Sequence, residues 1–227
     1  MGEIHDEMIE NCREGQGPCE MCPASQEHPV DDRHVHPGFF NYEADLMFID
    51  EQPNTDHFGY NDYTIHKDYD WYRNFFEPRI VSEDTSSWGL FEYFLLDIFE
   101  PLGYSRDEIP ELVYSTSTVK CPTKEYDSVD VESAWQNCQS YLEREVEEVQ
   151  PELVVTVGNL AMENALRILG VPNNITDDLL VSEDYGKFFQ EADYPTIVSP
   201  HYRNRFVKKE DYLPPIRDAV EDVLSPY

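Results

Sequence analysis

Residues 153–169 read Leu-Val-Val-Thr-Val-Gly-Asn-Leu-Ala-Met-Glu-Asn-Ala-Leu-Arg-Ile-Leu, and this stretch decides the fold. Its first residues are apolar, rich in β-branched side chains and closed by Gly158, which is typical of a strand buried on both faces. A helical pattern from Asn159 to Leu169 follows at once and ends at Gly170. A buried strand that passes directly into a helix indicates a parallel α/β sheet.

The same alternation of strand and helix extends in both directions from this stretch. Its pattern predicts strands over 44–49, 112–119 and 195–198, and helices over 90–99, 133–149 and 214–224. We therefore expect an α/β protein, a three-layer sandwich with a central, mostly parallel sheet. Residues 39–227 form this single domain. Residues 1–38 have little periodic apolar content and are expected to form an irregular N-terminal arm, and residues 54–80 are expected to form a long loop.

Polar residues follow each predicted strand, where parallel sheets bind their ligands. The segments 50–53, 115–117, 158–159 and 199–201 are therefore expected to surround one crevice. Asp50 and Glu51 place two carboxylates at the end of the first strand. A carboxylate there either orients water as a general base or caps a helix or turn, and the spacing leaves both roles open.

Four of the five cysteines fall into two pairs, Cys19 with Cys22 and Cys121 with Cys138. In an acidic intracellular chain thiols stay reduced, and two such pairs indicate a metal or iron–sulfur site rather than a disulfide framework. The fifth, Cys12, replaces one ligand or remains a thiol. The N-terminal histidines, together with Cys12, offer zinc a different site.

Acidic residues dominate the chain, with 47 Asp and Glu against 16 Lys and Arg and a net charge of −31. They are spread over the whole sequence, which favours a protein of a salt-loaded, halophilic cytoplasm over a specialised cation-binding protein. No apolar run approaches the roughly 20 residues of a membrane span, and the polar N-terminus does not resemble a secretory signal. A soluble, cytoplasmic monomer that does not bind membranes is expected.

Although acidic residues dominate the sequence, basic residues are concentrated in one segment. Four of them lie within seven positions after the last strand, beside an aromatic side chain: Arg203, Arg205, Lys208 and Lys209, next to Tyr202. Contact with the phosphates of a nucleic acid is the natural use of such a patch, with the tyrosine available for stacking. The alternative is that these cations neutralise neighbouring acidic side chains.

Taken together, several segments resemble the uracil-DNA glycosylase superfamily, in particular its iron–sulfur branch from archaea and thermophilic bacteria. The two cysteine pairs are similar to the family's cluster ligands. Residues 43–54 resemble its first motif, a strand ending Gly-Glu-Ala-Pro-Gly, and residues 113–121 its Val-Tyr-Ile-Thr-Asn-Val-Val-Lys-Cys segment. Residues 151–158 are similar to its Pro-Lys-x-Ile-Val-Thr-Leu-Gly strand, and residues 199–205 to the second motif, His-Pro-Ala-Tyr-Leu-Leu-Arg. The acidic, aromatic stretch at 59–88 has no counterpart.

The resemblance implies that a DNA base is flipped into a pocket and its N-glycosidic bond is hydrolysed. It implies catalytic roles for Glu51 and His201 and a 4Fe–4S cluster, with zinc as the alternative occupant. The implied cluster ligands are Cys19, Cys22, Cys121 and Cys138. The implied substrate-binding residues are Gln52, Pro53, Asn54, Ser117 and Ser199. The implied DNA contacts are Tyr202, Arg203, Arg205, Lys208 and Lys209.

The departures from the family lie in the pocket. Asp50 stands in place of a Gly, Ser117 in place of the base-reading Asn, and Ser199 in place of the second-motif His, with His201 two residues later. A serine hydroxyl cannot reproduce the bidentate pairing of an amide, so we expect altered specificity or reduced activity. The alternatives are a catalytically silent nucleic-acid-binding member that keeps the cluster as structure, and a zinc-stabilised interaction module.

Overall fold

The computed structural model describes residues 2–23, 38–51, 87–121, 131–172, 175, 179, 181–202, 204 and 206–225. Within them the elements follow one another in this order: α1 (Gly2–Glu14), η1 (Gly17–Cys19), β1 (Phe39–Phe40), β2 (Leu46–Asp50), α4 (Ser87–Phe99), η4 (Glu100–Leu102), α5 (Ile109–Leu112), β3 (Val113–Ser117), α6 (Val131–Val149), β4 (Leu153–Val157), α7 (Asn159–Ile168), α9 (Val181–Asp184), β5 (Phe188–Phe189), β6 (Thr196–Ser199) and α10 (Lys209–Leu224).

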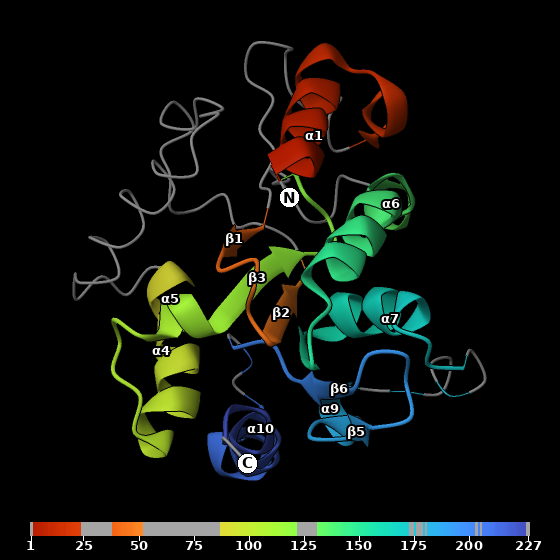
Figure 1. Ribbon diagram of the computed structural model, residues 1–227. Coiled ribbons are helices and arrows are strands. Elements are labelled where there is room, and N and C mark those ends of the chain that lie inside the picture. The colour runs from red at the N-terminus through yellow and green to blue at the C-terminus, as the bar shows by residue number, and fades with distance from the viewer. Residues whose placement is uncertain are drawn as a thin grey trace.

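The strands of the described residues form one six-stranded sheet in the order β1-β3-β2-β4-β6-β5 (Figure 1). The four inner strands, β3, β2, β4 and β6, are parallel. The two-residue outer strands β1 and β5 run antiparallel to their neighbours. The predicted mostly parallel sheet is therefore confirmed, and its carboxyl edge is the row at which the four inner strands end.

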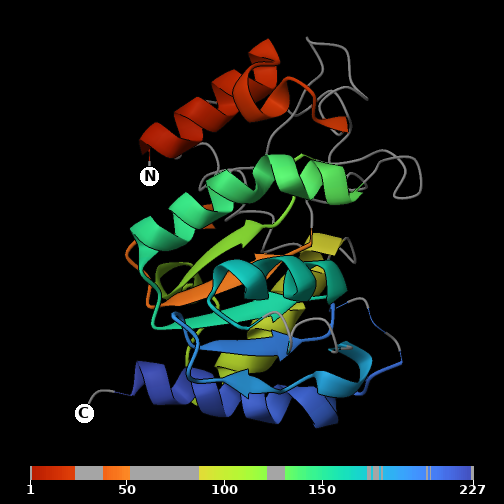
Figure 2. The ribbon, with the colours of Figure 1, turned by 90° about the vertical axis from the view of Figure 1, so that its right-hand side faces the viewer.

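Side chains of the central strand alternate between two apolar layers, as the two-residue period of a strand requires. Met47 and Ile49 belong to a core shared with α1, α6 and α7. Leu46 and Phe48 belong to a second core shared with α4 and α10. Figure 2 shows the resulting order, with α1 and α6 on one side of the sheet and α10 on the other. The three-layer sandwich expected from the sequence is confirmed.

The predicted inner strands and the helices between them are observed with shifts of a few residues at their ends. The last helix differs more, since α10 begins at Lys209 rather than at 214 and holds Pro214 and Pro215 in its interior. Proline removes a helical hydrogen bond and usually marks a helix start. Burial of Tyr212 and Leu213 against the sheet stabilises the turn before the prolines, so packing outweighs the lost bonds.

The N-terminal segment was expected to be irregular, and for residues 2–14 this prediction is wrong. They form helix α1, whose buried face carries Ile4, Met8, Ile9 and Cys12. These positions recur at intervals of three and four residues, which is the helical spacing that reveals the face in the sequence. This face belongs to the same apolar core as residues of α6. Apolar packing therefore docks α1, whether or not a metal group binds the cysteines.

Two expectations fall largely outside the described residues. They are the loop at 54–80 and most of the unmatched stretch at 59–88, of which Ser87 and Trp88 begin α4. Among the helices that the structure describes, none is long and apolar enough to cross a membrane.

Candidate functional site

The carboxyl edge of the sheet brings several predicted site residues into one row. In the register of the parallel strands, Asp50 at the end of β2 lies opposite Ser117 of β3 and Val157 of β4. Val157 in turn lies opposite Ser199 of β6. The Gly158 N–H donates to the carbonyl of Ser199 at 3.0 Å and continues the alignment one residue further. The edge therefore unites the ends of four strands that are far apart in the sequence.

Glu51 leaves β2 at this edge and reaches the start of α7. Its Oε1 accepts a hydrogen bond from the Leu160 N–H at 3.2 Å, at the end of the helix where the dipole favours negative charge. Gly158, at φ 99°, allows this approach, since a Cβ there would lie 2.4 Å from Oε1. The capping role considered for this carboxylate is therefore present, and it fixes the side chain beside the carboxyl edge.

Asp50 and His201 meet across the edge. The Nε2 atom of His201 lies 3.6 Å from Asp50 Oδ1, and the two side chains are 26% and 15% exposed. Asp50 Oδ1 also accepts the Glu51 N–H at 2.8 Å, so the carboxylate has a fixed orientation. The imidazole ring lies against Tyr202, with 4.1 Å between ring centroids. His201 thus contacts the residue that departs from the family's first motif, a pairing that the sequence did not predict.

The two serines differ in exposure. Ser117 is half-buried at the end of β3. Ser199 is fully buried, and its hydroxyl donates to the carbonyl of Pro200 at 3.0 Å. Its side chain is therefore not exposed to a substrate in this structure. The remaining predicted substrate-binding residues, Gln52, Pro53 and Asn54, lie outside the described residues.

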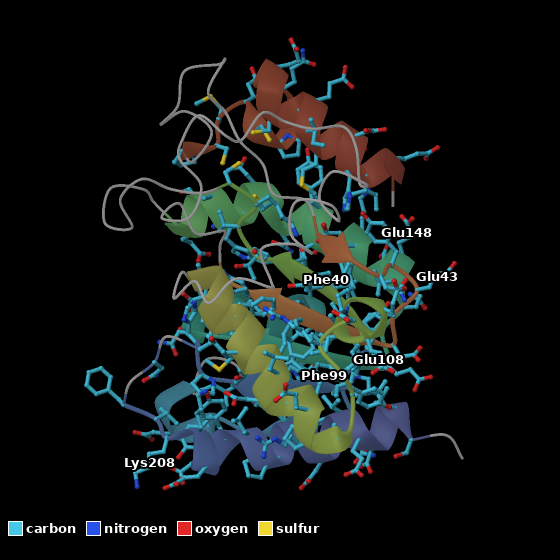
Figure 3. The ribbon with its side chains drawn as sticks, turned by 90° about the vertical axis from the view of Figure 1, so that its left-hand side faces the viewer. Phe40, Glu43, Phe99, Glu108, Glu148 and Lys208 are labelled. Atoms are coloured by element: carbon cyan, nitrogen blue, oxygen red, sulfur yellow. The ribbon has the colours of Figure 1, made fainter. Side chains whose placement is uncertain are left out.

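The predicted DNA contacts have structural partners where the structure describes them. Tyr202 is half-buried, with its ring centroid 5.6 Å from Phe91 and 6.4 Å from Phe94 of α4. Lys208 lies at the outer rim of the molecule (Figure 3) and pairs with Glu210 at 3.2 Å. Lys209 pairs with Asp97. The neutralising role considered for these cations is therefore present for the two lysines, and Arg203 and Arg205 lie outside the described residues.

All five cysteines are buried, and none forms a disulfide. They come from α1 (Cys12), η1 (Cys19), the turn after it (Cys22), the segment after β3 (Cys121) and α6 (Cys138). The Sγ atoms of Cys12 and Cys121 are 3.7 Å apart. The hydrogen bond from Cys12 lowers the pKa of Cys121. Burial and the charges of Cys138, Cys19 and Cys22 raise that pKa by more, so it lies above its ordinary value. The other four cysteines therefore all lie within electrostatic range of Cys121.

The surroundings of Cys138 contain groups that disfavour its thiolate form and groups that favour it. Burial and neighbouring thiolates raise its pKa to about 12. Two features of Lys120 oppose this, since its backbone N–H donates to Cys138 Sγ at 3.5 Å and its ammonium group favours the charged sulfur. Hydrogen bonds to sulfur of this kind tune iron–sulfur centres.

The donor set is that of a thiolate-bound metal site. Five buried thiols without disulfides, beside the buried Lys120, fit either zinc or an iron–sulfur cluster, since both are held by cysteine thiolates. Among the described residues no group of three or more His, Cys, Asp or Glu side chains is arranged to hold a metal ion.

A buried ion pair beside the cysteines was missed by sequence reasoning. Lys120 and Glu145 are 1% and 0% exposed, and Lys120 Nζ donates to Glu145 Oε2 and to Thr116 Oγ1, each at 2.5 Å. Burial raises the pKa of Glu145, but Lys120 and His5 outweigh it and hold the pKa at about 2. The position of Lys120 beside Cys121 is the signal that the sequence offered.

The same network fixes α1 to the sheet. His5 Nε2 lies 3.7 Å from Glu145 Oε1 and 3.4 Å from the Tyr114 hydroxyl. Its Nδ1 lies 2.9 Å from the Tyr42 hydroxyl. Because both ring nitrogens face these partners, His5 is unsuited to the zinc site considered for the N-terminal histidines and Cys12.

Comparison with known proteins identifies two similarities. The sequence model of the family described as Uracil DNA glycosylase superfamily matches residues 37–224. A curated protein, the type-5 uracil-DNA glycosylase of Pyrobaculum aerophilum, is 40% identical over 97 residues, which are 40% of this chain and 42% of the relative. The match therefore spans less than half of that relative's length, whereas the family match includes every strand of the sheet and the whole carboxyl edge.

Proposed function

Because this chain belongs to the uracil-DNA glycosylase superfamily, we propose that it excises a base from DNA by hydrolysing the N-glycosidic bond of a flipped-out nucleotide. The observation that carries the proposal is the convergence of Asp50, Glu51 and His201 at the carboxyl edge of the sheet. This is the edge at which a sheet of this topology binds its ligand.

The residues at this edge match the charges that develop as the bond breaks. The sugar becomes an oxocarbenium-like cation, and a carboxylate such as Glu51 stabilises it or positions the attacking water. The departing base becomes an anion, and the imidazole of His201 donates a hydrogen bond to it. Asp50 orients that imidazole across 3.6 Å, so two departures from the family's motifs are partners of each other.

Altered base specificity is part of the proposal. Ser117 stands at the end of β3, in register with Asp50, where the family reads the base with an amide. A hydroxyl donates and accepts through the same oxygen, whereas an amide has a separate donor group and acceptor group. Serine therefore discriminates less between bases than a bidentate amide does. Hypoxanthine and xanthine are therefore tested beside uracil.

DNA is the proposed partner, and the loop between β6 and α10 supports it. Phe206 in this loop is 97% exposed, between the proposed phosphate contacts Arg205 and Lys208. Apolar side chains of this kind insert between base steps in proteins that distort DNA. Lys208 and Lys209 have acidic partners, which reduces their share of the proposed phosphate contact.

We also propose that Cys19, Cys22, Cys121 and Cys138 hold a 4Fe–4S cluster. The cluster would tie η1 and the turn after it to β3 and α6, a structural role for which no substrate needs to reach the metal. A salt-loaded cytoplasm, proposed from the charge of −31, keeps such an acidic protein soluble.

A catalytically silent DNA-binding member is the second candidate function. Two observations favour it, namely that Glu51 caps α7 and that Ser199 is buried, with its hydroxyl bonded to the carbonyl of Pro200. A zinc-stabilised module, the third reading, is tested by metal analysis of the purified protein.

A strand-cleavage assay separates the first two candidates. Oligonucleotides with one uracil, hypoxanthine or xanthine are incubated at high salt with the wild type, with Glu51→Gln and with Glu163→Gln, a control on the exposed face of α7. We expect cleavage by the wild type and the control, and a loss of about a hundredfold for Glu51→Gln. Binding without cleavage of any substrate would favour the silent protein.

A further inference from the structure

Five thiols surround a site for which a 4Fe–4S cluster needs four. The fifth, Cys12, is fully buried and lies near the C-terminal end of α1. Its Sγ is 3.7 Å from Cys121 Sγ, and it is also within hydrogen-bonding range of Cys19. Cys12 therefore contacts one proposed ligand from each of the two cysteine pairs.

The position of Cys12 is set by rigid structure. Helix α1 is held by the buried Ile4 and Met8, which share the core with α6. Next to Cys12, the Asn11 side chain donates to the Tyr141 hydroxyl at 2.8 Å. One turn earlier, Glu7 pairs with Arg144 at 2.9 Å. These contacts to α6 hold the Cys12 sulfur beside Cys121 without any help from a metal.

We propose that Cys12 is a reserve ligand of the cluster, placed to bind iron in place of Cys121 or Cys19. The proposal rests on the proposed cofactor. The exchange transfers no electron, since the sulfur of Cys12 takes the coordination position while the departing thiolate takes up the proton that Cys12 releases. A damaged or oxidised ligand can then be replaced without loss of the cluster.

Cys138 provides the matched comparison. It lies on α6, and the neighbours that act on its sulfur are Lys120, Cys22 and Cys19. Because Cys12 contacts Cys121 and Cys19, we expect it to rescue the loss of either of these and not the loss of Cys138.

The experiment measures iron and acid-labile sulfide per chain, with the visible spectrum, in anaerobically purified full-length protein. The variants are Cys12→Ala, Cys121→Ala, Cys138→Ala and the double variant C12A/C121A. Alanine is used because serine could itself bind iron through oxygen. Circular dichroism monitors the fold, and if Cys121→Ala is insoluble, Cys19→Ala and C12A/C19A take its place.

We expect about four irons per chain in the wild type and in Cys12→Ala. Cys121→Ala is expected to keep most of this iron, and C12A/C121A and Cys138→Ala to lose nearly all of it. The proposal is overturned if Cys121→Ala loses iron as completely as Cys138→Ala, if C12A/C121A keeps as much as Cys121→Ala, or if Cys12→Ala alone loses the cluster. A wild type without iron would instead remove the cofactor proposal itself, and this inference with it.

Discussion

At the scale of single residues, the pairing of Asp50 with His201 bears on what the departures from the family's motifs mean. They either remove catalytic groups or replace them with a different pair of groups. In sequence, each departure removes a motif residue. In the structure the two new residues lie 3.6 Å apart at the carboxyl edge, where Glu51 is also fixed. Such a contact between the two differing residues is expected if Asp50 and His201 work as one functional unit.

The pair is tested by a double-mutant cycle on base excision in a single turnover. We expect Asp50→Asn to slow excision about tenfold and His201→Ala about a hundredfold, because the first orients the group that the second removes. The double variant should be no slower than His201→Ala alone. Asp45→Asn, at the exposed opposite end of β2, is the control. Effects that multiply in the double variant would mean that the two residues act independently.

Gly158 allows a second test, because its two constraints can be separated. Alanine at this position meets both a positive φ of 99° and the Glu51 carboxylate, whereas Gly103 has φ 91° with nothing within 4 Å of its Cβ position. We expect Gly103→Ala to cost about 1 kcal/mol in urea unfolding and Gly158→Ala about 1–3 kcal/mol more. Equal costs for the two variants would show that Glu51 does not need this close approach.

Sequence reasoning reached the site only in part. It predicted that the segments 50–53, 115–117, 158–159 and 199–201 meet, because parallel strands share a carboxyl edge. It could not predict that Ser199 is buried or that Lys209 pairs with Asp97, which lies 112 residues away. Such contacts depend on how helices pack on the sheet rather than on local pattern.

At the scale of elements, the apolar pattern of the sequence predicted the strands and helices that are long and well buried. The inner strands and the helices that connect them follow from runs such as 153–157. The pattern failed for the edge strands β1 and β5, since two residues carry no period. It also failed for α10, where the prolines indicated a later start than the packed Tyr212 and Leu213 produce.

The contact between α1, α6 and β3 depends on the buried pair Lys120–Glu145. Replacing Lys120 by Met removes the main cation beside the buried carboxylate and leaves only His5, so it is expected to cost about 3–5 kcal/mol of unfolding free energy. The double variant K120M/E145L should regain much of this, because no charge remains buried. A single variant as stable as the wild type in urea unfolding would contradict this account of the pair.

The same pair predicts a pH dependence. The folded pKa of Glu145 is lowered from 4.5 to about 2, so between these values the unfolded chain binds the extra proton. The stabilisation is therefore present above pH 4.5 and is lost as the pH falls towards about 2. The difference in unfolding free energy between wild type and Glu145→Gln should shrink over this window. A constant difference would contradict the lowered pKa.

At the scale of the whole molecule, the net charge of −31 opposes the proposed partner. DNA is itself a polyanion, so binding at low salt meets long-range repulsion. In molar salt the Debye length falls to about 3 Å, which leaves mainly contacts at short range. Base excision is therefore expected to be measurable at high salt and to weaken as salt is removed.

The measurement that tests the central claim most directly is the detection of free base by mass spectrometry. The wild-type protein, in excess and in molar salt, is incubated with uracil-, hypoxanthine- and xanthine-containing oligonucleotides, and the released base is compared with the abasic sites formed. The account predicts equal amounts of free base and abasic site from at least one substrate, and their loss in Glu51→Gln but not in Glu163→Gln. DNA that is bound yet releases no base from any of the three would contradict it.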